Sequence, residues 1–195
     1  ATTGVIHRQV EDVWASIESY AAPVLKKFGG PPFLLTSDER VRIAYFVAAT
    51  YMRAPAIVEH VKDFIARGHM TMLSVSHQSF ARDPDVMRRT MAQFASETGY
   101  PVPPDVTPDA FDPAHFRVEV PTTEAFRVML PTLDEMARRI WILGWTFFVP
   151  GDPDDIFVTS DNPYCMVNPE DPLTGSGLAR RAIEVTIPLH PRGAL

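Results

Sequence analysis

Cysteine is almost missing from this chain, and long apolar runs are missing altogether. The single Cys165 excludes an intrachain disulfide and a thiolate metal cage, which suits a reducing compartment. No apolar run reaches the roughly 20 residues that a bilayer-spanning helix needs. The longest candidate, Ile43 to Ala49, is flanked by Arg40, Arg42 and Arg53, a setting typical of a helix buried in a core. We therefore expect no membrane span and a cytoplasmic location.

Positive charge is also in short supply. Lys and Arg total 18 against 24 Asp and Glu, so the formal net charge is -6 and the pI is near 5.5. Non-specific binding of nucleic acid depends on clustered Lys and Arg that neutralise phosphates. The arginine pairs at 88–89, 138–139 and 180–181 are separate, which favours a solvated surface over a phosphate track. Nucleic acid is therefore not an expected partner.

The common metal and nucleophile motifs are missing too. The six histidines form no zinc-type pair at i and i+4, and Ser160 lacks the Gly-x-Ser-x-Gly elbow. Residues 151–171 hold several carboxylates and no Lys or Arg, which could supply oxygen ligands to Mg²⁺ or Ca²⁺. They lack the spacing of an EF-hand loop, so a hydrated turn is the favoured interpretation. No metal ligand is predicted, and the sequence specifies no cofactor.

Helical periodicity is what the chain does contain. Apolar residues recur at helical spacing through much of residues 1–144, and Thr36 with Glu39 has the spacing of a capping box. The predicted helices are Val5 to Phe28, a buried helix from Thr36 to Ala54, one from Pro55 that breaks near Gly68 and resumes, one from Asp83 to Gly99, and one from Thr122 to Leu143. The proline-rich residues 100–113 are expected to form a loop.

Short runs of β-branched and aromatic residues replace this pattern near the C-terminus. They predict strands at Trp145 to Val149, Asp155 to Thr159 and Ile183 to Ile187. The first two strands can form a hairpin through Pro150 to Asp154. Phe116 to Val120 alternates like a further short strand.

Length and element order together predict one domain of the α+β class. A chain of 195 residues fits a single core. We expect a mostly helical N-terminal body (1–144) packed on a small, largely antiparallel C-terminal sheet (145–195). The chain begins Ala1-Thr2-Thr3, without the basic segment and apolar core of a signal peptide, so export is not expected. The missing initiator Met fits trimming, or a fragment of a longer chain.

One stretch, Ile156 to Pro163, could carry chemistry. A strand-like run there leads Ser160, Asp161 and Asn162 into a turn. The end of a sheet holds such groups rigidly where they meet solvent, which suits ligand binding. Asp-Asn-Pro is also ordinary turn chemistry, because the Asp side chain accepts backbone amides and Pro fixes the exit. Taken alone, these residues favour a structural turn.

Two charged residues elsewhere are also candidates. Glu18 borders the apolar stripe of the first predicted helix, so its carboxylate is expected at the edge of the core. Arg53 lies near Arg42 on the one polar side of the second predicted helix, where a guanidinium could meet an acid. Alternatively, Glu18 is solvated and Arg53 satisfies carbonyl groups at its own helix end. The residues alone do not favour either alternative.

Four short motifs occur in an order that extends over nearly the whole chain. They are Ile17 to Leu25, Thr50 to Pro55, Trp145 leading to Phe157 to Pro163, and Ile187 to Pro191. Together they resemble a bacterial family of uncharacterised proteins, the domain of unknown function DUF4238. The resemblance implies that the family's characteristic polar positions are Glu18, Arg53, Ser160, Asp161, Asn162 and Pro163. It implies no reaction.

The chain also departs from the pattern of this family. Members usually open with a His-Tyr-Val-Pro strand and continue beyond the Pro-Leu-x-Pro segment, and neither part is present here. Thr50 stands where Gln is common. The missing parts bear on the completeness of the sheet and on any site that the opening His helps to form.

Two functions from different classes fit these residues. In the first, an enzyme-like polar pocket handles a small or phosphorylated substrate, with Asp161 or Glu18 as base, Arg53 as anion clamp, and Ser160 and Asn162 binding the ligand. In the second, a non-catalytic binding or interaction module uses the same residues as a structural ion-pair network. A small-molecule ligand is the expected partner, and the sequence does not specify the oligomeric state.

Overall fold

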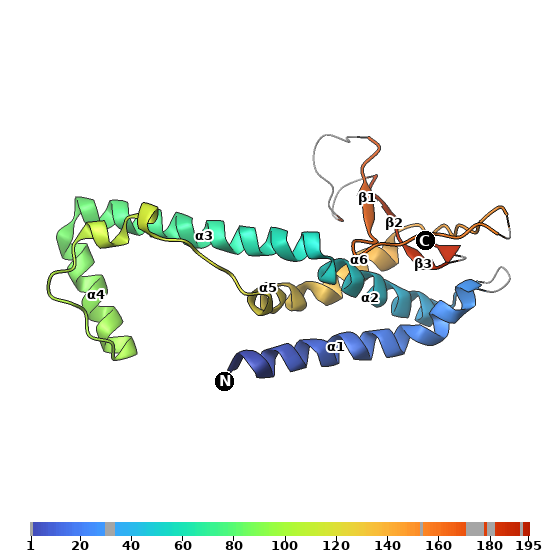
Figure 1. Cartoon of the computed structure of the whole chain (residues 1–195), viewed down its shortest axis with the longest axis horizontal. Helices are drawn as coiled ribbons and strands as arrows, with labels where there is room; N and C mark the ends of the chain where they lie inside the picture. The colour runs from blue at the N-terminus through green and yellow to red at the C-terminus, as the bar shows by residue number, and fades with distance from the viewer. Residues whose placement is uncertain (1, 30–33, 153, 171–177, 179–181, 192) are drawn as a thin grey trace. The chain divides into compact units, whose positions relative to one another are not determined.

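The computed structural model describes residues 2–29, 34–152, 154–170, 178, 182–191 and 193–195 (Figure 1). Its elements are α-helices, short 3₁₀ helices and two small antiparallel sheets, so the predicted α+β class is confirmed. The chain forms two compact units, residues 1–60 with 122–195 and residues 61–121. Within the described ranges, no helix is long and apolar enough to cross a membrane.

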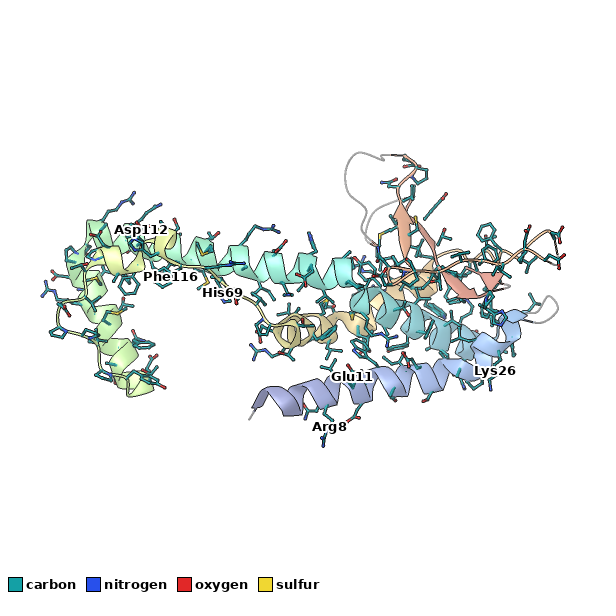
Figure 2. All side chains as sticks on the ribbon, viewed as in Figure 1. Arg8, Glu11, Lys26, His69, Asp112 and Phe116 are labelled. Carbon is teal, nitrogen blue, oxygen red and sulfur yellow. The ribbon has the colours of Figure 1, made fainter. Side chains whose placement is uncertain are left out.

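Helices make up most of the first unit. They are α1 (Thr2–Leu25) with the 3₁₀ turn η1 (Lys26–Gly29), α2 (Ser37–Arg53), α5 (Thr122–Met129), the turn η4 (Leu130–Thr132), and α6 (Leu133–Ile142). α2 packs against both α1 and α6. Its residues Ile43, Val47 and Met52 are almost sealed from solvent, as expected for a helix that is apolar nearly all round. Arg8 and Glu11 of α1 are exposed (Figure 2).

Both ends of α2 follow the predicted signals. Thr36 Oγ1 accepts a hydrogen bond from Glu39 N at 3.2 Å, and Thr36 N donates one to Glu39 Oε2 at 3.0 Å, which completes the predicted capping box. At the other end, Ala54 N donates to the Tyr51 carbonyl at 3.1 Å. Pro55 then begins α3 (Pro55–Arg82), because a first helical position needs no N–H. The end of α2 and the start of α3 are therefore adjacent.

The single helix predicted from Thr122 to Leu143 is wrong in one respect. The structure divides this stretch into α5 and α6, with η4 between them. The division falls at Pro131, which has no N–H to donate and whose ring obstructs a continuous α-helix. Thr132 Oγ1 donates to the Met129 carbonyl at 2.7 Å and so satisfies one acceptor at the break.

The second unit contains α3 from Val61 onward, α4 (Pro84–Thr98), and the 3₁₀ turns η2 (Pro108–Phe111) and η3 (Pro113–His115). The predicted break near Gly68 is wrong. α3 runs through it, because one glycine costs a helix only about 1 kcal/mol and obstructs nothing. Asp83 caps α4 as predicted, accepting from Asp85 N at 2.9 Å and Val86 N at 3.3 Å.

The strand predicted at Phe116 to Val120 is also wrong. The segment is not part of either sheet, and Phe116 is 45% exposed (Figure 2). Alternation over five residues forms a strand only when another strand supplies backbone partners, and none of the described strands pairs with it.

Strands form near the C-terminus, as predicted, but the strands predicted at 145–149 and 155–159 are wrong, because these segments form no strand beyond an isolated bridge at Phe148. β1 (Cys165–Val167) pairs antiparallel with β2 (Glu184–Thr186), and β3 (Pro188–His190) pairs antiparallel with β4 (Gly193–Ala194). The predicted strand from Ile183 to Ile187 is thus confirmed as β2.

The predicted hairpin between Trp145–Val149 and Asp155–Thr159 is wrong. Phe148 instead forms a bridge with Ala194, and Phe157 N donates to the Pro191 carbonyl at 2.7 Å. Both segments therefore face the last residues of the chain rather than each other. The apolar and β-branched composition of these segments indicates an extended backbone, but it does not indicate which segment each one pairs with.

Candidate functional site

Glu18 and Arg53 form an ion pair, and both sequence hypotheses require that these two residues lie close together. Arg53 Nη1 lies 2.6 Å from Glu18 Oε1, joining the last turn of α2 to α1. The Arg53 guanidinium also lies 5.8 Å from the centre of the Trp14 ring. The Arg53 and Glu18 side chains are 34% and 49% exposed, so the pair is at the surface rather than in a sealed core. Each of these two charges already has a partner of opposite sign.

The turn at Ser160 to Asn162 forms as the residue types indicate. Ser160 Oγ accepts a hydrogen bond from Asn162 N at 3.2 Å, and all three side chains are exposed. Asp161 makes no hydrogen bond or ion pair with any residue that the structure describes. The structure thus joins Glu18 with Arg53 and Ser160 with Asn162, and it does not join Asp161 to either pair.

A hollow of about 230 Å³ lies beside this turn, and we call it the tyrosine hollow. Its lining comes from the end of α2, the start of α3, and the segment that leads from the turn into β1. The lining residues are Tyr51, Ala56, Ile57, Asn162, Tyr164 and Met166. Asn162, a predicted ligand-binding residue, therefore faces the junction of α2 and α3.

Two phenol rings form one wall of the tyrosine hollow. The Tyr51 and Tyr164 ring centroids are 4.6 Å apart with the planes tilted by 57°. Tyr164 is 9% exposed, and its hydroxyl is buried without a hydrogen-bond partner among the described residues. Such a group costs about 1–3 kcal/mol and calls for an explanation.

Burial also determines the protonation of both phenols. It raises the pKa of the Tyr51 hydroxyl, and it raises the pKa of the Tyr164 hydroxyl further, with the neighbouring Tyr51 as the smaller cause. Both groups therefore keep their protons at neutral pH. Each can donate a hydrogen bond.

The first turn of α3 borders the tyrosine hollow. Ile57 N and Val58 N both donate to the Ala54 carbonyl, at 2.9 and 3.1 Å. The first turn of any helix has N–H groups without an intrahelical acceptor and carries a partial positive charge. Because Ala56 and Ile57 line the hollow, this positive end of α3 borders it.

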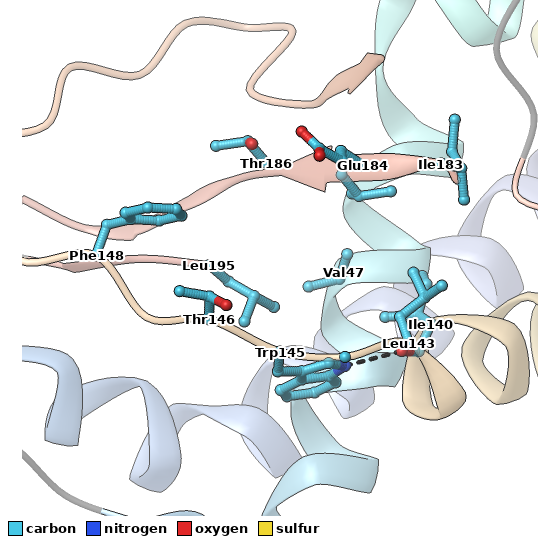
Figure 3. Close-up of a pocket in the computed structure, with 12 residues that line it drawn as sticks. Val47, Ile140, Leu143, Trp145, Thr146, Phe148, Ile183, Glu184, Thr186 and Leu195 are labelled. Atoms are coloured by element: carbon cyan, nitrogen blue, oxygen red, sulfur yellow. Dashed lines mark hydrogen bonds between the residues drawn. The ribbon is translucent and has the colours of Figure 1, made fainter. Parts of the chain in front are cut away.

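A second and larger hollow, of about 360 Å³, lies between the helices and the C-terminal strands (Figure 3). We call it the strand hollow. Val47 of α2 and Ile140 of α6 contribute to it, and Gly144 to Thr146 face β2 across it. Trp145 Nε1 donates to the Ile140 carbonyl at 2.9 Å, which fixes the indole ring at one wall.

Sequence reasoning missed Tyr51, Tyr164 and Arg40. Tyr51 and Tyr164 each lie in or beside a family motif, but neither has a charge that would draw attention. Arg40 Nη2 donates to the Trp141 and Leu143 carbonyls at 3.1 and 3.3 Å, and its guanidinium lies 4.8 Å from a ring centroid of Trp145. Arg40, which belongs to α2, thereby supplies hydrogen bonds to two carbonyl groups at the end of α6.

Potential metal ligands do not cluster in the described part of the chain. No group of three or more His, Cys, Asp or Glu side chains there is arranged to hold a metal ion. Asp152 accepts from Asp154 N at 2.9 Å, so within the acidic stretch this carboxylate serves a turn.

The fold and these hollows define an α+β protein with a buried central helix and concave surfaces in its first unit. The chain belongs to the family described as a protein of unknown function, DUF4238, whose model matches residues 2–195. The resemblance found in its motifs is thus confirmed. No curated protein and no solved structure matches the chain.

Proposed function

We propose that the chain is a binding module that holds a small anionic molecule in the tyrosine hollow. The observation that carries this proposal is the buried hydroxyl of Tyr164, which has no partner among the described residues. The hydroxyl has almost no accessible surface, so a ligand oxygen reaches it when the wall of the hollow shifts, and the new hydrogen bond then removes the cost of leaving the hydroxyl unsatisfied. The ligand, rather than the protein, then completes the hydrogen bonding of the wall.

The other lining groups determine the ligand class. The first turn of α3 attracts negative charge, and the two protonated phenols donate hydrogen bonds. The Asn162 amide can donate as well, while Ile57 and Met166 supply apolar contact. A small phosphate ester or carboxylate matches this combination of donors beside an apolar wall.

In this proposal, Glu18 and Arg53 have a structural role. Their pairing joins α1 to the end of α2, and α2 ends next to the start of α3. Arg53 is neutralised by Glu18, so the positive field at the hollow comes from the helix start and not from a guanidinium clamp. Ser160 supports Asn162 through the 3.2 Å hydrogen bond of the turn.

The test compares wild type with Tyr164→Phe. We expect a screen of phosphate esters and small carboxylates by thermal shift to give a ligand that stabilises wild type by about 2.7 kcal/mol at a hundredfold excess over Kd. Tyr164→Phe removes only the hydroxyl, so the free protein should keep or gain stability while the affinity falls about tenfold or more.

Tyr100→Phe is the matched control, because Tyr100 is 69% exposed and lies outside the hollow. It should bind like wild type. The proposal is wrong if Tyr164→Phe binds every stabilising ligand as tightly as wild type does. It is equally wrong if no phosphate ester or carboxylate stabilises the wild-type protein.

The rival proposal makes Glu18, Arg53 and Asp161 catalytic. Its support is the solvent exposure of Asp161 and its place next to Asn162 in the turn. It requires turnover of a bound phosphate ester that Asp161→Ala abolishes while binding is kept. A ligand that binds without turnover, with equal affinity for wild type and Asp161→Ala, favours the binding module.

A further inference from the structure

We infer that the ligand of the tyrosine hollow is a small aromatic carboxylate with a single negative charge, rather than a phosphate ester. This inference rests on the proposed function, because it names the class of ligand that the same hollow takes. It is carried by the start of α3, by the charges in and beside the lining, and by the size and apolar character of the remaining wall.

The start of α3 offers one backbone donor to such a ligand. Ala56 lines the hollow and is exposed, and no residue that the structure describes accepts a hydrogen bond from Ala56 N. Ala54, which precedes the helix, has no polar side chain that could cap it, and the first turn of α3 has no Asp or Glu in its sequence. A helix start carries a positive charge of roughly half an elementary charge. One carboxylate group matches this charge and this donor.

The lining supplies no full positive charge. None of the described residues that line the tyrosine hollow is a Lys or an Arg, and Arg53 at the end of α2 is already paired with Glu18. A phosphate ester carries a charge of about −1.5 to −2 at neutral pH, and Arg is the side chain best suited to bind it. The cost of removing an ion from water rises steeply with its charge. Neutral donors and one helix start therefore compensate a carboxylate, but they do not compensate a phosphate.

A negative charge of the protein also opposes a doubly charged ligand. Asp161 adjoins Asn162, which lines the hollow, and the Asp161 side chain is exposed. In the part of the chain that the structure describes, no cation forms an ion pair with this carboxylate. Because the Coulomb energy is proportional to each charge, its repulsion acts about twice as strongly on a doubly charged ligand as on a singly charged one.

The remaining wall determines the body of the ligand. The hollow has a volume of about 230 Å³, less than the roughly 300–1,000 Å³ of sites for drug-sized ligands. Ile57 and Met166 are half-buried, and the Tyr51 ring also lines the hollow. Aromatic rings pack favourably against a phenol ring, and a thioether sulfur contacts ring edges favourably. An aromatic ring with a short acid arm therefore matches this wall.

The test compares three probes that share a phenyl ring, namely phenylacetate, phenylacetamide and phenyl phosphate. Isothermal titration calorimetry of the wild-type protein at pH 7.5 should show phenylacetate binding at least tenfold more tightly than either of the others. The amide lacks the charge that the helix start attracts, and the phosphate carries more charge than the lining compensates. Equal or tighter binding of phenylacetamide or phenyl phosphate overturns the inference, and so does the absence of saturable phenylacetate binding.

Variants of Ala56 locate the carboxylate. Ala56→Pro removes the backbone donor and should weaken phenylacetate binding about tenfold, whereas Ala56→Gly keeps the donor and should bind like wild type. If Ala56→Pro fails to fold, the NMR signal of the Ala56 amide in the wild type decides. It should move on titration with phenylacetate, and an unmoved signal overturns the inference.

Tyr164→Phe separates this inference from the proposed function. If phenyl phosphate binds most tightly and Tyr164→Phe weakens its binding, the proposed function stands and only the choice of a carboxylate is wrong. If Tyr164→Phe binds every probe as tightly as wild type does, the proposed function is wrong and this inference falls with it.

Discussion

Tyr164 should make the stability of the protein sensitive to alkaline pH. Burial raises the pKa of its hydroxyl in the folded state above the value of about 10 found in an unfolded chain. The free energy of unfolding therefore keeps its full value below about pH 10. It falls as the pH rises further, because the hydroxyl then ionises freely only in the unfolded chain. Urea unfolding at pH 8 to 11 should show this loss, and Tyr164→Phe should show less of it.

Tyr51 and Tyr45 also have raised pKa values, the first through burial and the second chiefly through its hydrogen bond to Asp134. Tyr164→Phe therefore removes only part of the alkaline loss. Tyr51→Phe is the second variant in the series. If wild type and Tyr164→Phe lose the same free energy of unfolding between pH 9 and 11, Tyr164 is not buried as described.

The Glu18–Arg53 pair should add little to stability. Both side chains are a third or more exposed, and double-mutant cycles on such pairs give about 0.2–1 kcal/mol. We expect a coupling in this range from Glu18→Gln, Arg53→Gln and the double variant, measured by urea unfolding. A coupling well above 2 kcal/mol would mean that the pair is far less solvated than its exposure indicates.

Single residues were predictable where one helix determines their surroundings. Helical periodicity places Glu18 beside the apolar stripe of the first helix and Arg53 on the polar side of the second. Tyr164 could not be selected in this way. Its surroundings depend on Tyr51, in a distant part of the sequence, and the cost of its hydroxyl becomes visible only when the two rings meet.

The glycines of α3 and α4 should respond to alanine in opposite directions. Gly68 lies inside α3, and a Cβ added there meets nothing within 4 Å, so Gly68→Ala should raise the free energy of unfolding by about 1 kcal/mol. Gly99 has a φ of 73°, in the left-handed region, so Gly99→Ala should lower the free energy of unfolding by about 1 kcal/mol. Urea unfolding of both variants tests the pair, and a loss on Gly68→Ala would show that α3 is interrupted there.

The capping box of α2 should be worth about 1 kcal/mol. Thr36→Ala removes the acceptor for Glu39 N, and losses of this kind are about 0.5–2 kcal/mol. Urea unfolding of Thr36→Ala measures this loss.

Glu39 should make stability depend on acidic pH. The hydrogen bond from Lys27 is the main cause that lowers the pKa of Glu39. The stabilisation from the Lys27–Glu39 hydrogen bond is therefore present above the unfolded Glu pKa of about 4.3. It is lost as the pH falls through the lower pKa of Glu39 in the folded state. Urea unfolding at pH 7 and pH 3 should show a smaller effect of Glu39→Gln at pH 3.

Helix ends were predictable because their signals are local, whereas strand pairing was not. Thr36 and Asp83 contact residues two or three positions away, and both caps formed as predicted. Phe148 pairs instead with Ala194, near the other end of the C-terminal region, and Phe116 to Val120 found no partner among the described strands. Alternation indicates extended backbone, but the partner is determined by how distant segments pack.

Family membership and fold class depend on the chain as a whole. Four motifs spread from Ile17 to Pro191 identified the family because their order, rather than any one of them, is distinctive. The prediction of a single domain stays a prediction. It rests on length and composition, which do not show where buried contacts are sparse.

Residues 61–121 should open more readily than the rest of the chain. The described apolar side chains that are buried in this unit are Phe80 and Met87, whereas α2 alone buries Ile43, Val47 and Met52. Regions with few buried apolar contacts open with less free energy than the global value. In native-state hydrogen exchange, amides of α4 should therefore exchange at least tenfold faster than those of α2, a difference of about 1.4 kcal/mol. Limited proteolysis should cut first in the segment 100–121, which has no α-helix. Equal exchange in α4 and α2 would instead show that all 195 residues unfold together as one cooperative domain.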